Sequence, residues 1–280
     1  MYLEFLGLRE KPFSVTADPT FLYLSKRHRE ALSHMIYGIR ERKGFIEITG
    51  EIGTGKTTLC KTLLRQLDGN TKTALVLHSG LSELQLLYTV VQDFGLDPMR
   101  NNRLTLFNQL NQFLLEQAHL GQNIVLVIDE AQNLSLRVLE QIRMLSNLET
   151  DKEKLIQIVL VGQPQLREKL NLPAMRQLHQ RIGVRYHIQP LDLDEVRTYI
   201  EHRLQVAGSN GSLGWTEEAI EEIYQRSKGI PRLINLICDR ALLACYVLRG
   251  KRVDRGIVRR SHQELMGEAL HHMGNSGGAR

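Results

Sequence analysis

The sequence predicts an α/β protein with a parallel sheet, followed by a smaller all-helical domain. Residues 45–67 read in order as a strand, a glycine-rich turn and a helix, which is a building unit of α/β folds. The run 124–128 is apolar at every position, as in a parallel strand covered on both faces. From Asp192 onward only helical patterns occur, which indicates a separate helical domain.

The remaining elements follow from hydrophobic spacing and turn residues. Residues 1–25 mix prolines with scattered aromatic residues and read as an ordered loop that packs against another part of the chain. Helical spacing occurs at 28–42, 56–67, 81–94, 104–118, 134–148, 175–182, 194–206, 216–227, 231–248 and 255–266. Short β-type runs occur before Gly50 and at 73–77, 124–128, 156–161 and 184–188.

Composition is typical of a soluble globular protein. The chain has 280 residues, of which 42% are hydrophobic and 24% charged, and this length suits two domains. No apolar run approaches the roughly 20 residues that span a bilayer, and the N-terminus lacks the pattern of a signal peptide. Three cysteines without a C-x-x-C pair fit a reducing compartment. These features predict a cytoplasmic protein.

Basic residues are concentrated in three stretches, and the net charge is +5. The stretches are 26–29, 40–43 and 249–260. Such runs are more often a solvated face than a nucleic-acid footprint. Taken alone, they leave DNA or an anionic membrane surface open as partners.

The glycine-rich turn at 50–58 has the pattern G-x-x-x-x-G-K-[ST] of a phosphate-binding loop. Its glycines let backbone N–H groups point inward, and the helix that begins at Lys56 adds its positive dipole end. Lys56 supplies a charge to the phosphates, and the Thr57 hydroxyl is a ligand for Mg²⁺. The predicted binding residues are Gly50, Glu51, Ile52, Gly53, Thr54, Gly55, Lys56, Thr57 and Thr58.

Polar residues end two further strands of the predicted sheet. Asp129 and Glu130 follow the apolar run 124–128, and Gln163 follows 156–161. Because ligands bind at the carboxyl ends of strands in open α/β sheets, these residues should lie beside the phosphate loop. Asp129 and Glu130 match the Walker B element, in which the first acid holds Mg²⁺ and the second orients the attacking water. Gln163 is either a sensor of the γ-phosphate and water or an ordinary turn residue.

The helical domain contributes one candidate. Pro231 suits the first position of a helix, so Arg232 extends from a helix N-terminus. Its planar, permanently charged guanidinium suits phosphate recognition. The alternative is a solvent-exposed arginine at a helix start.

These motifs, in this order, resemble the AAA+ ATPases, a class of P-loop NTPases, and within them the ATPases of the general secretion pathway protein A type. The resemblance covers Tyr2 to about Met266. Its specific parts are Lys11-Pro12-Phe13, Asp18-Pro19, the phosphate loop, Asp129-Glu130-Ala131-Gln132-Asn133-Leu134, Val161-Gly162-Gln163-Pro164, Gln180-Arg181-Ile182 and Gly229-Ile230-Pro231-Arg232.

The resemblance implies roles for several residues. Gln163 corresponds to sensor 1, although many AAA+ proteins have Asn, Ser or Thr there, and Arg232 corresponds to sensor 2. Arg181 corresponds to the arginine finger, with Arg176 and Arg185 as nearby rivals. The implied catalytic set is Lys56, Glu130, Gln163 and Arg181. The N-terminal loop is expected near the adenine.

The resemblance also implies the domain organisation. Residues 1–190 are expected to form the AAA+ nucleotide-binding α/β domain, with the N-terminal loop and helix at 1–43 included. Residues 191–267 are expected to form a helical lid domain. The small, polar residues 268–280 are expected to be a disordered tail.

The leading functional hypothesis is Mg²⁺-dependent ATP hydrolysis that drives assembly of an envelope secretion, pilus or exopolysaccharide-export system. The expected partners are further copies of the chain, in an ATP-dependent ring or arc, and the machinery at the cytoplasmic face of the inner membrane. One alternative is a DNA-binding ATPase that assists transposition. Another is a nucleotide-gated binding module without turnover, which requires an idle Glu130.

Overall fold

The structure is a computed structural model that describes residues 2–16, 18–77, 80–99, 102–149 and 154–267. The tail at 268–280, expected to be disordered, lies outside these residues. The chain divides into two compact units. Residues Leu24–Gln189 form one, called here the α/β unit. Residues Met1–Tyr23 and Pro190–Arg280 form the other, called the helical unit.

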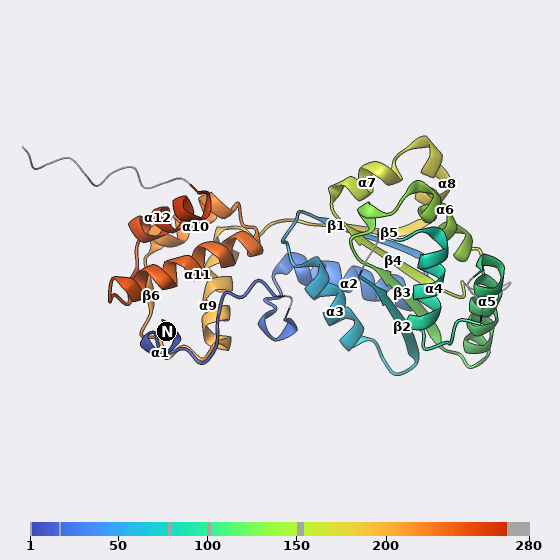
Figure 1. The fold of residues 1–280 in the computed structure, drawn as a ribbon, viewed down its shortest axis with the longest axis horizontal. Helices are drawn as coiled ribbons and strands as arrows, with labels where there is room; N and C mark the ends of the chain where they lie inside the picture. Colours follow the sequence, from blue (N-terminus) through green and yellow to red (C-terminus); the bar gives the residue numbers. More distant parts are fainter. Residues whose placement is uncertain (1, 17, 78–79, 100–101, 150–153, 268–280) are drawn as a thin grey trace, which may run out of the picture. The chain divides into compact units, whose positions relative to one another are not determined.

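Five parallel strands form the sheet of the α/β unit (Figure 1). Their order is β2-β3-β4-β1-β5, which confirms the predicted parallel α/β fold. The strands are β1 Phe45–Gly50, β2 Thr71–Val76, β3 Asn123–Ile128, β4 Gln157–Gly162 and β5 Ile182–Ile188. Because β4 lies between β3 and β1, the carboxyl ends of these three strands meet at one edge of the sheet.

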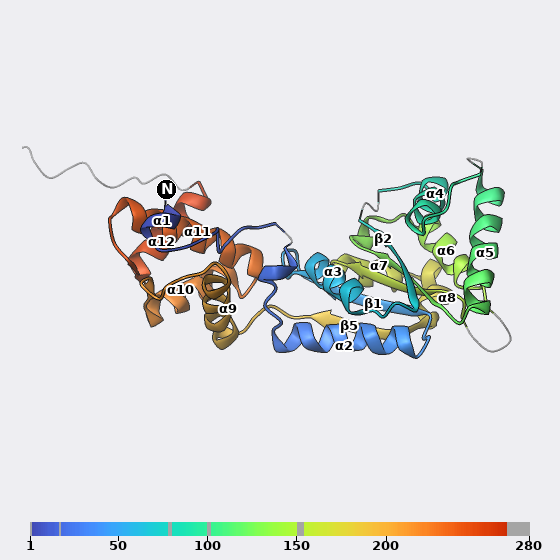
Figure 2. The same cartoon turned by 90° about the horizontal axis from the view of Figure 1, so that it is seen from below.

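Helices cover both faces of this sheet, and Figure 2 shows α2 running along one of them. Helices α2 and α3 pack on one face with Val125 and Val127 of β3. Helices α4 to α8 pack on the other with Ile124, Leu126 and Ile128. The alternation explains why 124–128 is apolar at every position. The helices are α2 Lys26–Arg40, α3 Lys56–Gln66, α4 Glu83–Asp93, α5 Arg103–His119, α6 Leu136–Leu145, α7 Pro164–Leu170 and α8 Arg176–Arg181.

Two details of the α/β unit differ from the predicted elements. The helix expected at 134–148 is the shorter α6, and a 3₁₀ turn, Ala131–Asn133, precedes it. Helix α7 was not predicted, because Gly162-Gln163-Pro164 reads as a turn. Pro164 instead occupies the start of α7, where the missing N–H costs no hydrogen bond.

Four longer helices build the core of the helical unit. They are α9 Leu193–Val206, α10 Glu217–Ser227, α11 Pro231–Val247 and α12 Arg255–Leu265, joined by the short helix α1 Tyr2–Phe5 and a two-stranded pair, β6 Gly214–Trp215 and β7 Arg252–Val253. In the described parts of the chain, no helix combines the length and the apolar composition of a bilayer span.

The sequence predicts that residues 1–43 belong to the α/β domain. Residues 24–43, with α2, lie in the α/β unit, but residues 1–23 cluster with the helical unit. Phe13 and Phe21 are buried in the core of the helical unit. Arg203 of α9 donates from Nε to the Pro12 carbonyl and from Nη2 to the Ser14 carbonyl at 3.1 Å. Its guanidinium also lies 4.8 Å from the centre of the Phe21 ring. Because these contacts join positions about 190 residues apart, local sequence patterns do not predict them.

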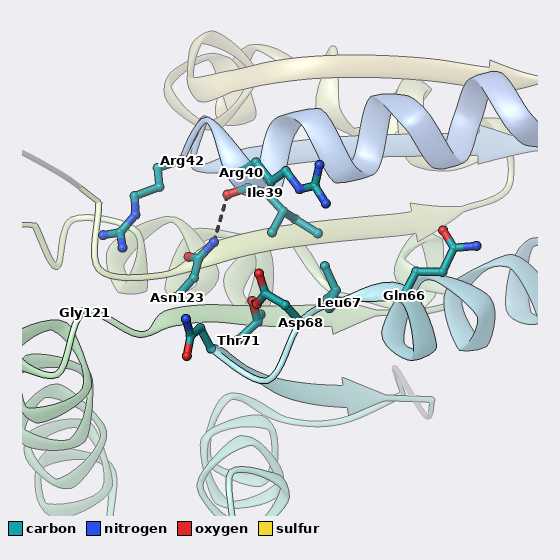
Figure 3. A pocket seen from close by; sticks show the side chains of 10 residues that line it. Ile39, Arg40, Arg42, Gln66, Leu67, Asp68, Thr71, Gly121 and Asn123 are labelled. Atoms are coloured by element: carbon teal, nitrogen blue, oxygen red, sulfur yellow. Dashed lines mark hydrogen bonds between the residues drawn. The ribbon is translucent and has the colours of Figure 1, made fainter.

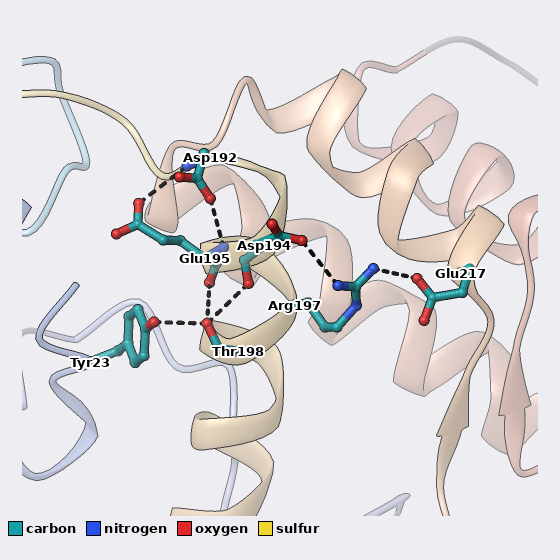
Figure 4. Close-up of polar contacts among 7 residues, drawn as sticks. All are labelled: Tyr23, Asp192, Asp194, Glu195, Arg197, Thr198 and Glu217. Atoms are coloured by element: carbon teal, nitrogen blue, oxygen red, sulfur yellow. Dashed lines mark hydrogen bonds and ion pairs between the residues drawn. The ribbon is translucent and has the colours of Figure 1, made fainter. Parts of the chain in front are cut away.

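Tyr23, the last residue of this segment, is hydrogen-bonded to the first turns of α9 (Figure 4). Asp192 caps α9 by accepting from the Glu195 N–H at 2.8 Å, in a capping box. The hydroxyls of Tyr23 and Thr198 lie 2.7 Å apart. The chain therefore enters the α/β unit directly after a residue that is hydrogen-bonded to α9.

Candidate nucleotide-binding site

The loop between β1 and α3 has the backbone geometry of an anion site. Gly53 and Gly55 have φ values of +83° and +90°, in the left-handed region that favours glycine. Gly55 is the N-cap of α3, and no side chain caps the helix. The first N–H groups of α3 therefore face the loop without a side-chain acceptor, which suits a phosphate.

Close packing around this loop leaves little room for a side chain at Gly50. A Cβ at this position would lie 3.0 Å from the Thr54 hydroxyl and 3.1 Å from the Ile188 carbonyl of β5. The Thr54 hydroxyl donates to the Glu51 carbonyl at 2.8 Å. A side chain at Gly50 would therefore displace the loop or the neighbouring strand. Ile52 is 57% exposed at the outside of the loop, and Thr58 is half-buried in the first turn of α3.

Lys56 is buried inside the loop, with 5% of the residue exposed. Its Nζ donates to the carbonyls of Gly50 and Glu51, both at 2.9 Å. Burial lowers the pKa of Lys56, and the nearby carboxylates of Glu130, Asp129 and Glu51 oppose that shift. The ammonium group is thus held within the loop where the sequence motif predicts a phosphate ligand.

Asp129 and Thr57 meet at the ends of β3 and the start of α3. The Thr57 hydroxyl donates to Asp129 Oδ2 at 2.5 Å, and the Glu130 N–H donates to Oδ1 at 2.8 Å. Burial raises the pKa of Asp129, while these two hydrogen bonds lower it. A hydroxyl and a carboxylate at one point are hard oxygen ligands of the kind that Mg²⁺ prefers. The residues present therefore fit this ion.

Glu130 is held by two glutamines. Its Oε2 accepts from Gln132 Nε2 at 2.6 Å and from Gln163 Nε2 at 3.2 Å. Glu130 also has φ +52°, an uncommon conformation for a residue other than glycine. The structure therefore brings Gln163 to Glu130. It also brings Gln132, for which the motifs predict no role, to the same carboxylate.

Gln132 links the ends of β3 and β4. Besides its bond to Glu130, its Oε1 accepts from the Gln163 N–H at 3.0 Å. A Cβ at Gly162 would lie 2.8 Å from this Oε1, so glycine leaves room for the contact. Lys169 Nζ donates to the carbonyls of Gln132 at 2.6 Å and Leu134 at 2.7 Å. In the sequence, only the position of Gln132, two residues after Glu130, indicates that the two side chains could meet.

The three candidate arginine fingers differ in their contacts. Arg181 donates to the Ser146 hydroxyl at 3.0 Å and to Asn147, both just after α6. Arg185 forms an ion pair of 3.3 Å with the buried Glu47 of β1. Arg176 is exposed at the start of α8. The structure thus places Arg181 outside the hydrogen-bond network of Lys56, Asp129 and Glu130 in its own chain.

Arg232 lies in the helical unit, exposed at the second residue of α11. The start of α11 is positioned by Gly229, whose φ is +73°. A Cβ at Gly229 would lie 1.9 Å from the Leu191 carbonyl oxygen, and the Leu191 N–H donates to the Gly229 carbonyl at 2.9 Å. Only glycine allows the two backbone segments to approach this closely.

A separate cavity of about 220 Å³ lies at the opposite edge of the sheet (Figure 3). It is lined by the ends of α2 and α3 and by the starts of β2 and β3, where Asn123 Nδ2 donates to the Ile39 carbonyl at 2.9 Å. Because the phosphate loop follows the carboxyl end of β1, this cavity is not part of the nucleotide site.

Comparisons with known proteins agree with this geometry. The AAA domain family matches residues 39–170. General secretion pathway protein A of Aeromonas hydrophila is 44% identical over 268 residues, which are 95% of this chain. The chain spans 49% of the length of that relative.

Solved structures share the fold at low sequence identity. Cdc6p of Pyrobaculum aerophilum has a TM-score of 0.64 and 20% identity, covering 88% of this chain and 70% of its own. The ORC2 protein of Aeropyrum pernix has a TM-score of 0.62 and 17% identity, covering 85% and 66%. The family match and the parallel sheet show that residues 39–170 carry an AAA domain with a P-loop NTPase fold, and the chain is similar to general secretion pathway protein A over most of its length.

Proposed function

We propose that the chain binds ATP with Mg²⁺ and hydrolyses it to ADP and phosphate. The observation that carries this proposal is that the start of α3, with Lys56 and Thr57, meets the end of β3, with Asp129 and Glu130. Lys56 lies in the phosphate loop, Thr57 is bonded to Asp129, and Glu130 is held beside them by Gln163. An inert nucleotide-binding loop would not need the second carboxylate to be directed in this way.

The phosphate loop supplies the binding contacts. Backbone N–H groups at residues 50–58 and the Lys56 ammonium bind the phosphate oxygens. Thr57 and Asp129 would hold Mg²⁺, which when bound supplies neutralising charge to the β- and γ-phosphates. Burial strengthens these interactions, since Asp129 is only 1% exposed.

Glu130 and Gln163 have separate proposed roles, at the attacking water and at the γ-phosphate. The Glu130 carboxylate accepts hydrogen bonds and is positioned to orient the attacking water. The Gln163 amide, which donates to the same carboxylate at 3.2 Å, is the proposed sensor of the γ-phosphate. Arg232 is the proposed second sensor, and Arg181 the proposed finger toward the nucleotide of a neighbouring copy.

We infer from the resemblance to general secretion pathway protein A that hydrolysis serves an envelope secretion machine. We propose accordingly that the protein acts in the cytoplasm, at the inner-membrane face, as an ATP-dependent ring or arc. The support is the 44% identity over 95% of this chain.

DNA binding remains an alternative function with less support. In the basic stretch 249–260, Arg255 and Arg259 form ion pairs of 3.0 and 3.2 Å with Glu222, which also binds Arg226 at 3.0 Å. Part of the positive charge is therefore balanced within the helical unit. Affinity for DNA that falls steeply with salt would favour this alternative.

Two substitutions test hydrolysis. Lys56→Ala should abolish binding of a fluorescent ATP analogue, because the loop loses its charge. Glu130→Gln should keep the affinity but lower phosphate release by about 100-fold or more, since the water loses its acceptor. Glu168→Gln, an exposed position on α7, is the matched control. Undiminished turnover in Glu130→Gln would remove that residue from the proposed role, and chelation of Mg²⁺ should stop wild-type turnover.

A further inference from the structure

A buried histidine touches the phosphate loop from outside. His28 lies in the first turn of α2 and is 3% exposed. Its Nε2 is 2.8 Å from the Thr54 carbonyl oxygen, and its Nδ1 is 2.8 Å from the Ser25 hydroxyl. Ser25 is fully buried and also accepts from the His28 backbone N–H at 3.3 Å, as the N-cap of α2.

The partners of His28 assign its tautomer. A carbonyl oxygen only accepts hydrogen bonds, so Nε2 carries the proton. In the neutral ring Nδ1 is then an acceptor, and the Ser25 hydroxyl donates to it. Since the Ser25 oxygen accepts the His28 backbone N–H, each of these groups has a matched partner. An unmatched imidazole at this depth would be costly.

The contact determines which way a peptide group faces. Because the peptide unit is planar and trans, the Gly55 N–H points opposite to the Thr54 carbonyl. Holding that carbonyl against His28 therefore turns the Gly55 N–H toward the inside of the loop. Thr54 is also held through its N–H and hydroxyl, which donate to the Glu51 carbonyl at 3.3 and 2.8 Å.

Packing leaves little freedom around this contact. A Cβ at Gly55 would lie 3.3 Å from His28 Nε2, and the left-handed φ of Gly55 disfavours any side chain there. The contact therefore combines a hydrogen bond with close approach of ring and loop.

We propose that His28 is a positioning residue for the phosphate loop, which orients the Gly55 N–H toward the phosphates through the Thr54 carbonyl. The proposal rests on the proposed function for its effect on ATP. It requires a donor at the reach of Nε2 and does not require a charge.

Substitutions of different reach test the proposal. Gln can place an amide donor near the position of Nε2, whereas Asn reaches only about as far as Nδ1. We expect His28→Gln to keep ATP affinity within about threefold of wild type. His28→Asn and His28→Ala should each weaken it by about tenfold, the effect of losing one hydrogen bond. His34→Ala, at an exposed position of the same helix, should leave affinity unchanged.

The measurements are the affinity for a fluorescent ATP analogue, the melting temperature, and the Gly55 amide resonance in nucleotide-free protein. His28→Asn should shift that resonance, and His28→Gln should restore it. Equal affinity in the Asn and Gln variants, or an unshifted Gly55 signal in His28→Asn, would overturn the role of His28. If wild-type protein fails to bind nucleotide, the proposed function falls, and the Gly55 signal still decides whether His28 orients the loop.

Discussion

The backbone conformation of Glu130 is uncommon, and the orientation of its carboxylate depends on neighbouring side chains. Its left-handed backbone conformation costs on the order of 1 kcal/mol or more for a residue with a Cβ. Its carboxylate is directed by Gln132, which also binds the Gln163 backbone. Gln132 thus holds both the proposed water-orienting residue and the proposed sensor, although it is not itself expected to contact the phosphates.

Removing Gln132 should therefore separate turnover from binding. Gln132→Ala is expected to lower kcat by about tenfold or more, because Glu130 loses a charge-assisted hydrogen bond. The affinity for ATP should change little, since the phosphate loop is untouched. Gln112→Ala removes a similar glutamine–glutamate bond on the surface of α5 and serves as the control. A Gln132→Ala protein with wild-type kcat would contradict the positioning role of Gln132.

At the scale of elements, one glutamate joins two helices of the helical unit. Glu222 of α10 is 4% exposed and accepts from Arg226 of the same helix and from Arg255 and Arg259 of α12. Burial alone would raise the pKa of Glu222. Hydrogen bonds from Arg255, Arg259 and Arg226 outweigh it and hold the pKa at about 2.

This lowered pKa predicts a pH-dependent contribution to stability. The folded-state pKa lies below the ordinary value of about 4.3, so the stabilisation is present above that value and is lost as pH falls toward 2. Glu222→Gln should lower the free energy of unfolding at pH 7 by about 1 to 3 kcal/mol. The difference from wild type should shrink between about pH 5 and pH 2.

Urea unfolding followed by the fluorescence of Trp215 measures this effect, because the single tryptophan lies in the helical unit. Glu221→Gln, the exposed neighbour on α10, should stay within about 0.5 kcal/mol of wild type. A difference that is constant from pH 7 to pH 2 would show that Glu222 acts through packing instead of charge.

At the scale of the whole molecule, Arg181 predicts cooperation between copies of the chain. Its guanidinium donates to Ser146 and Asn147 just after α6, and it shares no hydrogen-bond partner with Lys56 among the bonds of the described residues. An arginine finger supplied in trans contributes roughly 10³ to 10⁵ in rate. Arg181→Ala and Lys56→Ala should each be nearly inactive alone, and their mixture should partly regain turnover at interfaces that pair the intact residues.

The control for this experiment is Arg176→Ala, because Arg176 is exposed and close in sequence. Arg185 is less suitable, since its removal would leave the buried Glu47 without its ion-pair partner at 3.3 Å. Co-assembly of the mixed chains is verified by size-exclusion chromatography with ATP. An inactive mixture of co-assembled chains would refute the in-trans role, and full activity of Arg181→Ala would assign the finger to another residue.

Local sequence patterns determined much of this protein. The parallel α/β fold followed from one glycine-rich turn and a few apolar runs, because strand burial and helix spacing leave direct traces in neighbouring residues. The same patterns brought Asp129, Glu130 and Gln163 to the phosphate loop, since the carboxyl ends of adjacent parallel strands share one edge. The glycine-rich motif alone was enough to predict Lys56 and Thr57 as binding residues.

Only the tertiary structure decided which distant segments meet. It assigned residues 1–23 to the helical unit, and it placed His28 against Thr54 and Gln132 between Glu130 and Gln163. His28 does follow the apolar stripe of its helix, at the spacing of Ala31, Leu32 and Met35. Its partner lies 26 residues away, however, and a hydrogen bond at that separation depends on how elements pack, which leaves no periodic trace in the sequence.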